Sequence, residues 1–166
     1  FFDDTLKYCL NCKRCEVACP SGVRVADIIQ AARIKYSSQP PKLRDMILAN
    51  TDFMGTVATT VAPVVNFTLG LKPTKTVMDA VLKVDKHRTF PKYASKTFEK
   101  WYKKNVAAFQ NSFPRHVSMF HGCYVNYNYP QLGKDLVSVM NALGYGVHLL
   151  ENEKCCGTAL ISNGMI

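Results

Sequence analysis

The sequence is short of acidic residues, with 12 Asp and Glu against 21 Lys and Arg, so its formal net charge is +9. No glycine-rich nucleotide loop, nucleophile or general base is apparent in it, and it has no internal repeat or low-complexity segment. These absences argue against substrate chemistry carried out by this chain itself. A chain of 166 residues can form one ordinary domain, or two small ones tied together by more than apolar packing.

An initiating methionine is also missing, since the sequence opens at Phe1 and stops at Ile166, shortly after a Cys-Cys-Gly triplet. The stop falls inside what the residue pattern predicts as an unfinished α/β unit. We therefore expect this sequence to be a fragment, and the lack of a leader segment at its start says nothing about targeting.

Cysteine, by contrast, is plentiful, and its number is odd. The seven residues form a group of four, a single residue and a pair, namely Cys9, Cys12, Cys15, Cys19, Cys123, Cys155 and Cys156. A secreted disulfide framework is usually shorter, loop-rich and even in its cysteine count. Cysteines at gaps of two residues instead favour metal binding in a reducing compartment.

The first group, CLNCKRCEVACP at residues 9–20, is typical of a ligand run for a [4Fe-4S] cluster. Three cysteines follow one another at gaps of two residues, and a gap of three leads to the fourth, which proline follows at once. Zinc sites usually combine two separated two-cysteine knuckles, so structural zinc and free thiols are the weaker alternatives.

The same spacing predicts that the four thiolates serve two clusters. In two-cluster ferredoxins, three closely spaced cysteines hold one cube and the fourth ligates the other. Cys9, Cys12 and Cys15 therefore need a partner from elsewhere, and Cys19 belongs to a cluster whose other ligands lie outside this sequence. We expect a second motif of this kind upstream of Phe1, within a few tens of residues.

Three cations near this group, Lys13, Arg14 and Arg24, are candidates for tuning the cluster potential. A unit charge about 8 Å away, at an effective dielectric constant of about 40, contributes about 1 kcal/mol and raises the potential by roughly 40 mV. The hypothesis is that these residues make the cluster a moderate electron acceptor. The alternative is ordinary solubilising charge.

Apolar periodicity predicts a helix over about residues 24–36 and a second over residues 42–49. Val77, Val81 and Val84 form one face of a further predicted helix. An amphipathic aromatic helix carries Phe98, Trp101 and Tyr102. Core packing is the usual meaning of such an aromatic stripe, and docking on a membrane surface or a subunit is the sharper alternative.

Two adjoining stretches between these helices are candidates for contact with a partner. Residues 53–71 carry no charge, but Pro63 and Asn66 favour helices packed inside the protein over a membrane span, with an interfacial segment as the second reading. Residues 72–104 hold ten Lys or Arg against Asp79, Asp85 and Glu99, a net charge of +7. Nucleic acid, an anionic membrane, an acidic subunit and plain solvent all suit that charge.

After Pro114 the pattern changes to a predicted βαβ unit, with the strands HVSMF and GVHLL on either side of the helix PQLGKDLVSVMNALGY. A right-handed crossover would make the two strands parallel. The helix is expected to bury a set of apolar side chains, namely Leu132, Leu136, Val139, Met140 and Leu143.

The remaining cysteines follow these two strands. Cys123 comes after the first strand, and Cys155 and Cys156 come after the second, at the strand ends where open α/β sheets bind ligands. The three thiols should therefore converge as cluster ligands, a redox disulfide or a structural trio. His121 is either an added ligand or a polar loop residue, and His87, His116 and His148 show no pattern.

Two long segments, LKYCLNCKRCEVACPSGVRVADIIQAARIKY and FHGCYVNYNYPQLGKDLVSVMNALGYGVHLLENEKCCG, resemble the C subunits of anaerobic sn-glycerol-3-phosphate dehydrogenases. The LKP and TFPKY segments between them fit as well, so the resemblance covers essentially the whole sequence. The sequence is similar, more loosely, to the D subunit of heterodisulfide reductase and to the iron-sulfur subunit of glycolate oxidase.

The resemblance implies an α+β, multi-domain fragment. Residues 1–38 would be the C-terminal half of an α-helical-type bacterial 2[4Fe-4S] ferredoxin domain, and residues 39–112 a basic helical connector with a membrane or subunit contact. Residues 113–166 would be the first βαβ unit of a cysteine-rich domain named for its Cys-Cys-Gly motif. The first four cysteines match the ferredoxin ligands, and Cys123, Cys155 and Cys156 match the start of the cysteine-rich domain, where the heterodisulfide reductase relatives hold a further cluster.

The resemblance also implies an electron-transfer subunit that is not itself the substrate-oxidising site. Electrons would come from a flavin-containing dehydrogenase subunit, in a complex with a second subunit, and pass to the menaquinone pool, with no nucleic acid involved. The subunit would lie peripherally on the cytoplasmic face of the bacterial inner membrane. Two alternatives stay open: thiol and disulfide chemistry at the second cysteine set, as in heterodisulfide reductase or a glycolate/lactate oxidase iron-sulfur subunit, and a zinc-held basic module.

Overall fold

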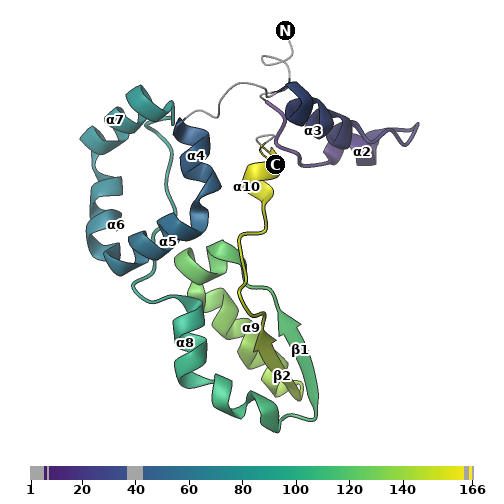
Figure 1. Ribbon diagram of the computed structural model, residues 1–166, viewed down its shortest axis with the longest axis vertical. Coiled ribbons are helices and arrows are strands. Elements are labelled where there is room, and N and C mark those ends of the chain that lie inside the picture. Colours follow the sequence, from purple (N-terminus) through teal and green to yellow (C-terminus); the bar gives the residue numbers. More distant parts are fainter. Residues whose placement is uncertain (1–5, 7, 37–42, 163–164, 166) are drawn as a thin grey trace. The chain divides into compact units, whose positions relative to one another are not determined.

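The computed structural model describes residue 6 and residues 8–36, 43–162 and 165. The chain divides into two compact units, one made of residues 1–49 with 157–166 and the other of residues 50–156. The described part is mostly helical and contains one parallel sheet of two strands (Figure 1). The predicted connector, residues 39–112, is divided between the two units, and the domain boundaries given above stay a prediction.

The first unit contains the helices α2 (Arg14–Ala18), α3 (Val25–Tyr36), α4 (Leu43–Ala49) and α10 (Thr158–Ser162). Helices α3 and α4 confirm those predicted over residues 24–36 and 42–49. Helix α2 contacts α3, and α10 contacts α4. Among the described residues of this unit only Ala26 is buried, with 1% of its surface exposed. Since burial of apolar surface drives folding, this part of the chain gains little stability from its own core.

The second unit begins with three helices, α5 (Thr51–Thr60), α6 (Ala62–Gly70) and α7 (Lys72–Leu82). The uncharged stretch forms α5 and α6, which break at Val61, just before Pro63 in the first turn of α6. No single helix in the described part is long and apolar enough to cross a membrane. Helices α5 and α6, bent by 104° relative to each other, are together long and apolar enough by length and composition alone. Helix α7 ends at Lys83, which adopts the left-handed conformation.

The prediction of one valine face on α7 is wrong in part. Val77 and Val81 lie on the helix but are 61% and 62% exposed, and Val84 lies beyond its end. The helix stops early because Lys83 turns left-handed, with its N–H bonded to the carbonyl oxygens of Asp79 and Met78.

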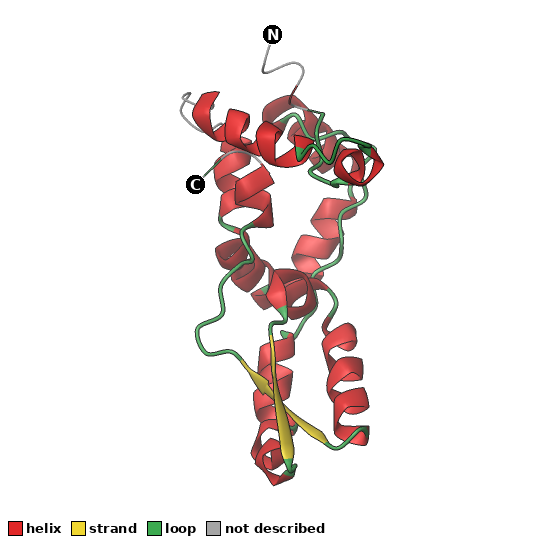
Figure 2. Ribbon diagram, turned by 90° about the vertical axis from the view of Figure 1, so that its right-hand side faces the viewer, coloured by secondary structure: helices red, strands yellow, loops and turns green. Residues whose placement is uncertain are grey.

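The rest of the second unit is a βαβ arrangement preceded by the aromatic helix. Its elements are α8 (Phe98–Asn105), η1 (Ala107–Ser112), β1 (Arg115–Met119), η2 (Tyr124–Asn128), α9 (Pro130–Ala142) and β2 (Tyr145–Leu149). The two strands pair in parallel, as predicted, with Arg115 opposite Tyr145 and Met119 opposite Leu149. Figure 2 shows the two strands in yellow, and α9 contacts both α8 and β2.

The aromatic stripe of α8 belongs to the core of this unit, which confirms the packing interpretation. Phe98 is fully buried and Tyr102 is 5% exposed, and they pack with Met119, Val137 and Val147. The Thr97 hydroxyl caps the helix by accepting a hydrogen bond from the Lys100 N–H at 3.2 Å. The Thr97 cap therefore fixes where α8 begins, and the aromatic side chains fix which face of the helix is buried.

The predicted inward face of α9 is wrong for four of its five residues. The exposed fractions of Leu132, Leu136, Val139 and Leu143 are 51%, 43%, 56% and 60%. The helix has two apolar stripes, and the one that contains Val137 and Met140 faces the core. Gly133 determines which stripe is buried. A Cβ at this position would lie 2.6 Å from the Phe98 ring, so α8 can pack closely against α9 only on the face that carries Gly133.

Candidate functional site

The first cysteine group lies on a loop that leads into and out of α2. Cys9 ends a turn in which its N–H bonds to the Leu6 carbonyl oxygen at 3.1 Å. Asn11 and Lys13, on either side of Cys12, both adopt the left-handed conformation, with φ of 52° and 59°. Two such residues so close together coil the backbone tightly around Cys12, as is common at functional loops.

The thiols of this loop have the chemistry that iron-sulfur clusters require. All four are free, with Cys9 and Cys19 half-buried and Cys12 and Cys15 exposed. Four free thiols within eleven residues fit the donor set of a [4Fe-4S] ligand run. Their sulfur atoms are not gathered, because the described residues contain no group of three His, Cys, Asp or Glu placed to hold a metal ion.

Two of the three predicted tuning cations share one carboxylate. Lys13 Nζ lies 3.2 Å from Asp27 Oδ1, and Arg24 forms an ion pair with the other oxygen of Asp27. Arg14 is exposed at the start of α2 and pairs with no carboxylate in the described part of the chain. The charge that this loop presents is therefore smaller than the count of its cations suggests.

Arg33 is a site residue that the sequence analysis missed. From the last turns of α3, its guanidinium donates to the carbonyl oxygen of Cys9 at 2.8 Å and also to the carbonyl oxygens of Leu6 and Ser162. The sequence does contain a signal for it: Arg33 follows the buried Ala26 by seven residues, or two helical turns, so both lie on the same face of α3. A guanidinium that bonds backbone carbonyls in this way fixes the start of the cysteine loop.

In the second unit, the structure brings Cys123 and Cys155 together. Cys123 lies just before η2 and Cys155 lies beyond β2, and Cys155 is near enough to influence the Cys123 thiol electrostatically. Burial raises the pKa of the Cys123 thiol, and the neighbouring Cys155, Cys156 and Asp52 raise it further because each is negative when ionised. The raised pKa therefore favours the protonated form of the Cys123 thiol.

His121 lies beside this pair as a polar partner of Glu153. Their side chains are only 7% and 5% exposed, and His121 Nδ1 lies 3.2 Å from Glu153 Oε1. The Glu153 carboxylate also accepts the backbone N–H of Gly122 at 2.6 Å and that of His121 at 3.1 Å. The His121 ring packs edge-on against Phe98, with 5.6 Å between centroids. Neither Glu153 nor its contacts were predicted from the sequence.

A second missed carboxylate comes from α5. Asp52 Oδ2 accepts the backbone N–H of Cys155 at 2.9 Å, across 103 residues of sequence. No sequence pattern predicts this contact, because the two residues lie far apart in the chain. Asp52 directly precedes the uncharged stretch of residues 53–71.

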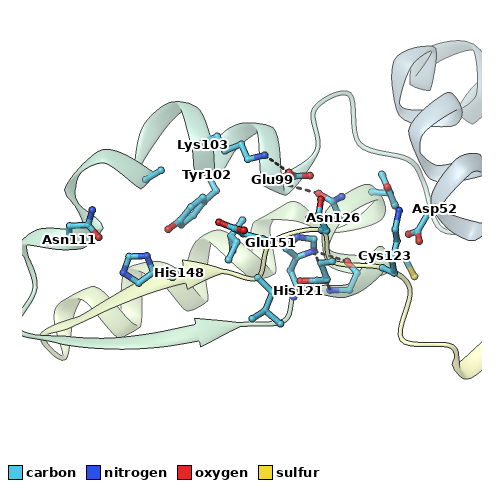
Figure 3. A pocket seen from close by; sticks show the side chains of 18 residues that line it. Asp52, Glu99, Tyr102, Lys103, Asn111, His121, Cys123, Asn126, His148 and Glu151 are labelled. Atoms are coloured by element: carbon cyan, nitrogen blue, oxygen red, sulfur yellow. Dashed lines mark hydrogen bonds and ion pairs between the residues drawn. The ribbon is translucent and has the colours of Figure 1, made fainter.

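A pocket of about 560 Å³ lies at the carboxyl ends of the two strands, where the sequence predicted a site. Asp52, His121, Cys123 and His148 are among its lining residues. Figure 3 shows Asp52 and Cys123 at one end of this pocket and His148 with Asn111 at the other. His148 Nε2 lies 3.0 Å from Nδ1 of His116 on the neighbouring strand, a pairing that neither residue's sequence context indicated.

Comparison with known proteins agrees with the cysteine motifs. Residues 117–166 match the family model described as a cysteine-rich domain. The chain is 57% identical over 163 residues to the C subunit of the anaerobic glycerol-3-phosphate dehydrogenase of Escherichia coli, a match that covers 98% of this chain and 41% of that protein. The chain thus spans about two fifths of the length of that relative. The resemblance inferred from the sequence is confirmed.

More distant relatives are methanogen proteins. An uncharacterized iron-sulfur protein of Methanococcus maripaludis is 28% identical over 106 residues, covering 47% of this chain and 22% of that protein. The B subunit of a fumarate reductase (CoM/CoB) of Methanothermobacter marburgensis is 30% identical over 89 residues, covering 50% of this chain and 18% of that protein. No solved structure is significantly similar to the chain.

Proposed function

We propose that this chain, a homologue of the C subunit of anaerobic glycerol-3-phosphate dehydrogenase, is part of an iron-sulfur subunit that carries electrons from a flavin-containing dehydrogenase subunit toward menaquinone. The observation that supports this most is the 57% identity over 98% of the chain, a match long enough to span the region of the four-cysteine run. We assign substrate oxidation to the partner subunit, since this sequence shows no glycine-rich loop for a nucleotide cofactor.

Cys9, Cys12, Cys15 and Cys19 would hold [4Fe-4S] clusters, two of them in the intact protein, with Cys19 serving the second. A bound cluster takes up and releases one electron at a time. The protein supplies the thiolates, and Arg33 holds the Cys9 end of the loop in place. The sparse core of the first unit supports this assignment, because a small unit with little buried apolar surface needs another source of stability, such as metal ligation.

Low-temperature EPR with iron and sulfide analysis tests this proposal on the intact subunit, reconstituted anaerobically and reduced with dithionite. Two interacting cubane signals are expected, since the split ligand set places two clusters close together. Zinc without iron would contradict the proposal and would favour the zinc-held basic module instead.

Replacing Asp27 by asparagine is expected to raise the midpoint potential of the cluster at Cys9, Cys12 and Cys15. The change releases the charges of Lys13 and Arg24, which Asp27 now neutralises in part. An uncompensated unit charge about 8 Å away shifts the potential by a few tens of millivolts. Redox titration followed by EPR measures this shift. Asp45→Asn on α4 is the control, and an equal potential in both variants would contradict the tuning hypothesis.

A second candidate function is thiol and disulfide chemistry at Cys123 and Cys155. It is favoured by the electrostatic proximity of these two thiols and by the similarity to a fumarate reductase subunit whose name includes CoM and CoB. In this case the pair, with Cys156, would reduce a disulfide or hold a further cluster. Turnover of a disulfide substrate by the intact protein, lost on Cys123→Ser, would support it.

We also propose that the subunit lies peripherally on the cytoplasmic face of the inner membrane, with α5 and α6 in contact with lipid. Three apolar side chains of these helices are strongly exposed, with fractions of 70% for Phe53, 63% for Val64 and 68% for Phe67. The basic residues of 72–104 follow them directly and suit anionic headgroups. Phe53→Ser with Phe67→Ser is expected to release the subunit from anionic vesicles in a sedimentation assay. Binding as tight as that of the wild type would contradict the contact.

A further inference from the structure

We propose that Asp52 and Glu153 form a carboxylate clamp, a pair of positioning residues that hold the two cysteine-bearing loops so that the thiols of Cys123 and Cys155 meet. One loop follows β1 and carries Cys123, and the other follows β2 and carries Cys155. Both carboxylates bind backbone N–H groups of these loops. The clamp concerns how the two cysteines are brought together. It holds whether they bind a cluster or carry out thiol chemistry.

Glu153 ties the second loop to the first. It belongs to the loop after β2, yet both its oxygens accept N–H groups from His121 and Gly122 in the loop after β1, at 3.1 Å and 2.6 Å. Gly122 turns the backbone here with φ of 65°, a conformation that presents neighbouring N–H groups to one acceptor. Because Glu153 lies two residues before Cys155 and His121 two before Cys123, these contacts restrain the backbone that leads into both cysteines.

Asp52 holds Cys155 from a distant part of the sequence. It lies in the first turn of α5, outside residues 117–166 that match the cysteine-rich domain, and accepts the Cys155 N–H at 2.9 Å. Helix α5 is itself seated on η2, since a Cβ at Gly55 would lie 2.3 Å from the Tyr127 ring. Thr56 Oγ1 also lies 3.3 Å from the Tyr127 hydroxyl oxygen. The helix therefore delivers Asp52 to the thiols as part of the same packed unit.

The electrostatics of the site support a positioning role for these carboxylates. A negative charge near thiols disfavours their ionisation, and Asp52 contributes to raising the pKa of Cys123. A buried carboxylate is unfavourable unless hydrogen bonds compensate it, and Glu153 has two N–H donors and the His121 ring as partners. Asp52 therefore does not favour the thiolate, and the contribution of both acids is the geometry that their hydrogen bonds impose.

The rate of disulfide formation between Cys123 and Cys155 tests the clamp. The full-length subunit, freed of iron and carrying Cys156→Ser, is treated with diamide. Each thiol gives up one proton and one electron to the N=N bond of diamide as the S–S bond forms, and peptide mass mapping quantifies the Cys123–Cys155 product. Glu153→Gln and Asp52→Ala are expected to slow the reaction at least about tenfold, since each loses charge-assisted hydrogen bonds.

Matched controls separate positioning from a general change in charge. Glu151→Gln removes an exposed carboxylate from the same loop, and Asp135→Asn removes one from the surface of α9, so both are expected to react within about twofold of the parent protein. Glu153→Asp keeps the charge and is expected to recover part of the rate. If Glu153→Gln fails to fold, as judged by circular dichroism, Asp52→Ala and Asp52→Asn decide. Clamp variants that react as fast as Glu151→Gln would overturn the proposal.

Discussion

Substituting serine for Cys12 is expected to remove about half of the iron from the intact subunit, from about eight to about four atoms. Cys12 is the middle of three closely spaced thiols that would hold one cube, and its exposed side chain leaves few other roles for it. Electron flow to quinone should fall at least about a hundredfold, while substrate oxidation with an artificial acceptor at the flavin site stays largely intact. Iron analysis, EPR and the two activity assays measure these effects.

The matched control for this variant is Cys19→Ser. The split ligand set assigns Cys19 to the other cluster, so this variant should lose a similar amount of iron but retain a different EPR signal. Identical residual spectra in the two variants would show that all four cysteines serve one cluster. Loss of both activities in Cys12→Ser would point to a structural role for the subunit.

The substitution of alanine for Phe98 is expected to destabilise the second unit by about 3–5 kcal/mol. Phe98 is fully buried, and its ring lies 5.9 Å from the Trp101 ring centroid and 5.6 Å from that of His121. Because Gly133 approaches the ring closely, the neighbouring helix α9 has no side chain there to fill the cavity. Urea unfolding of the intact subunit, followed by hydrogen exchange at β2, measures the loss.

The control for Phe98→Ala is Phe109→Ala, which removes a phenyl ring of the same size that is 45% exposed. Its cost should stay below about 1.5 kcal/mol, because less apolar surface returns to water. An equal cost for the two variants would show that Phe98 does not centre the core. Since His121 packs on Phe98, the destabilised variant should also show faster exchange at the Gly122 N–H.

Sequence patterns predicted the helices and strands better than they predicted which side chains are buried. The helix over residues 24–36, the aromatic helix and the parallel strands were all predicted, because periodicity and turn residues act over a few positions. The buried face of α9 was not, since its two apolar stripes look alike in sequence and only the approach of Phe98 to Gly133 distinguishes them. The valine face of α7 failed because one left-handed lysine ended the helix early.

By itself, the sequence determined the prediction of iron-sulfur chemistry, because cysteine spacing limits which metal centres a loop can hold. It also placed Cys123 and Cys155 at one sheet edge, since parallel strands end on the same side. Only the tertiary structure decided which charged groups lie beside the cysteine loops: Asp52 reaches Cys155 across 103 residues, and Asp27 pairs with both Lys13 and Arg24 and so offsets part of their charge. Hydrogen bonds and ion pairs of this kind depend on distances in space, which local sequence patterns do not encode.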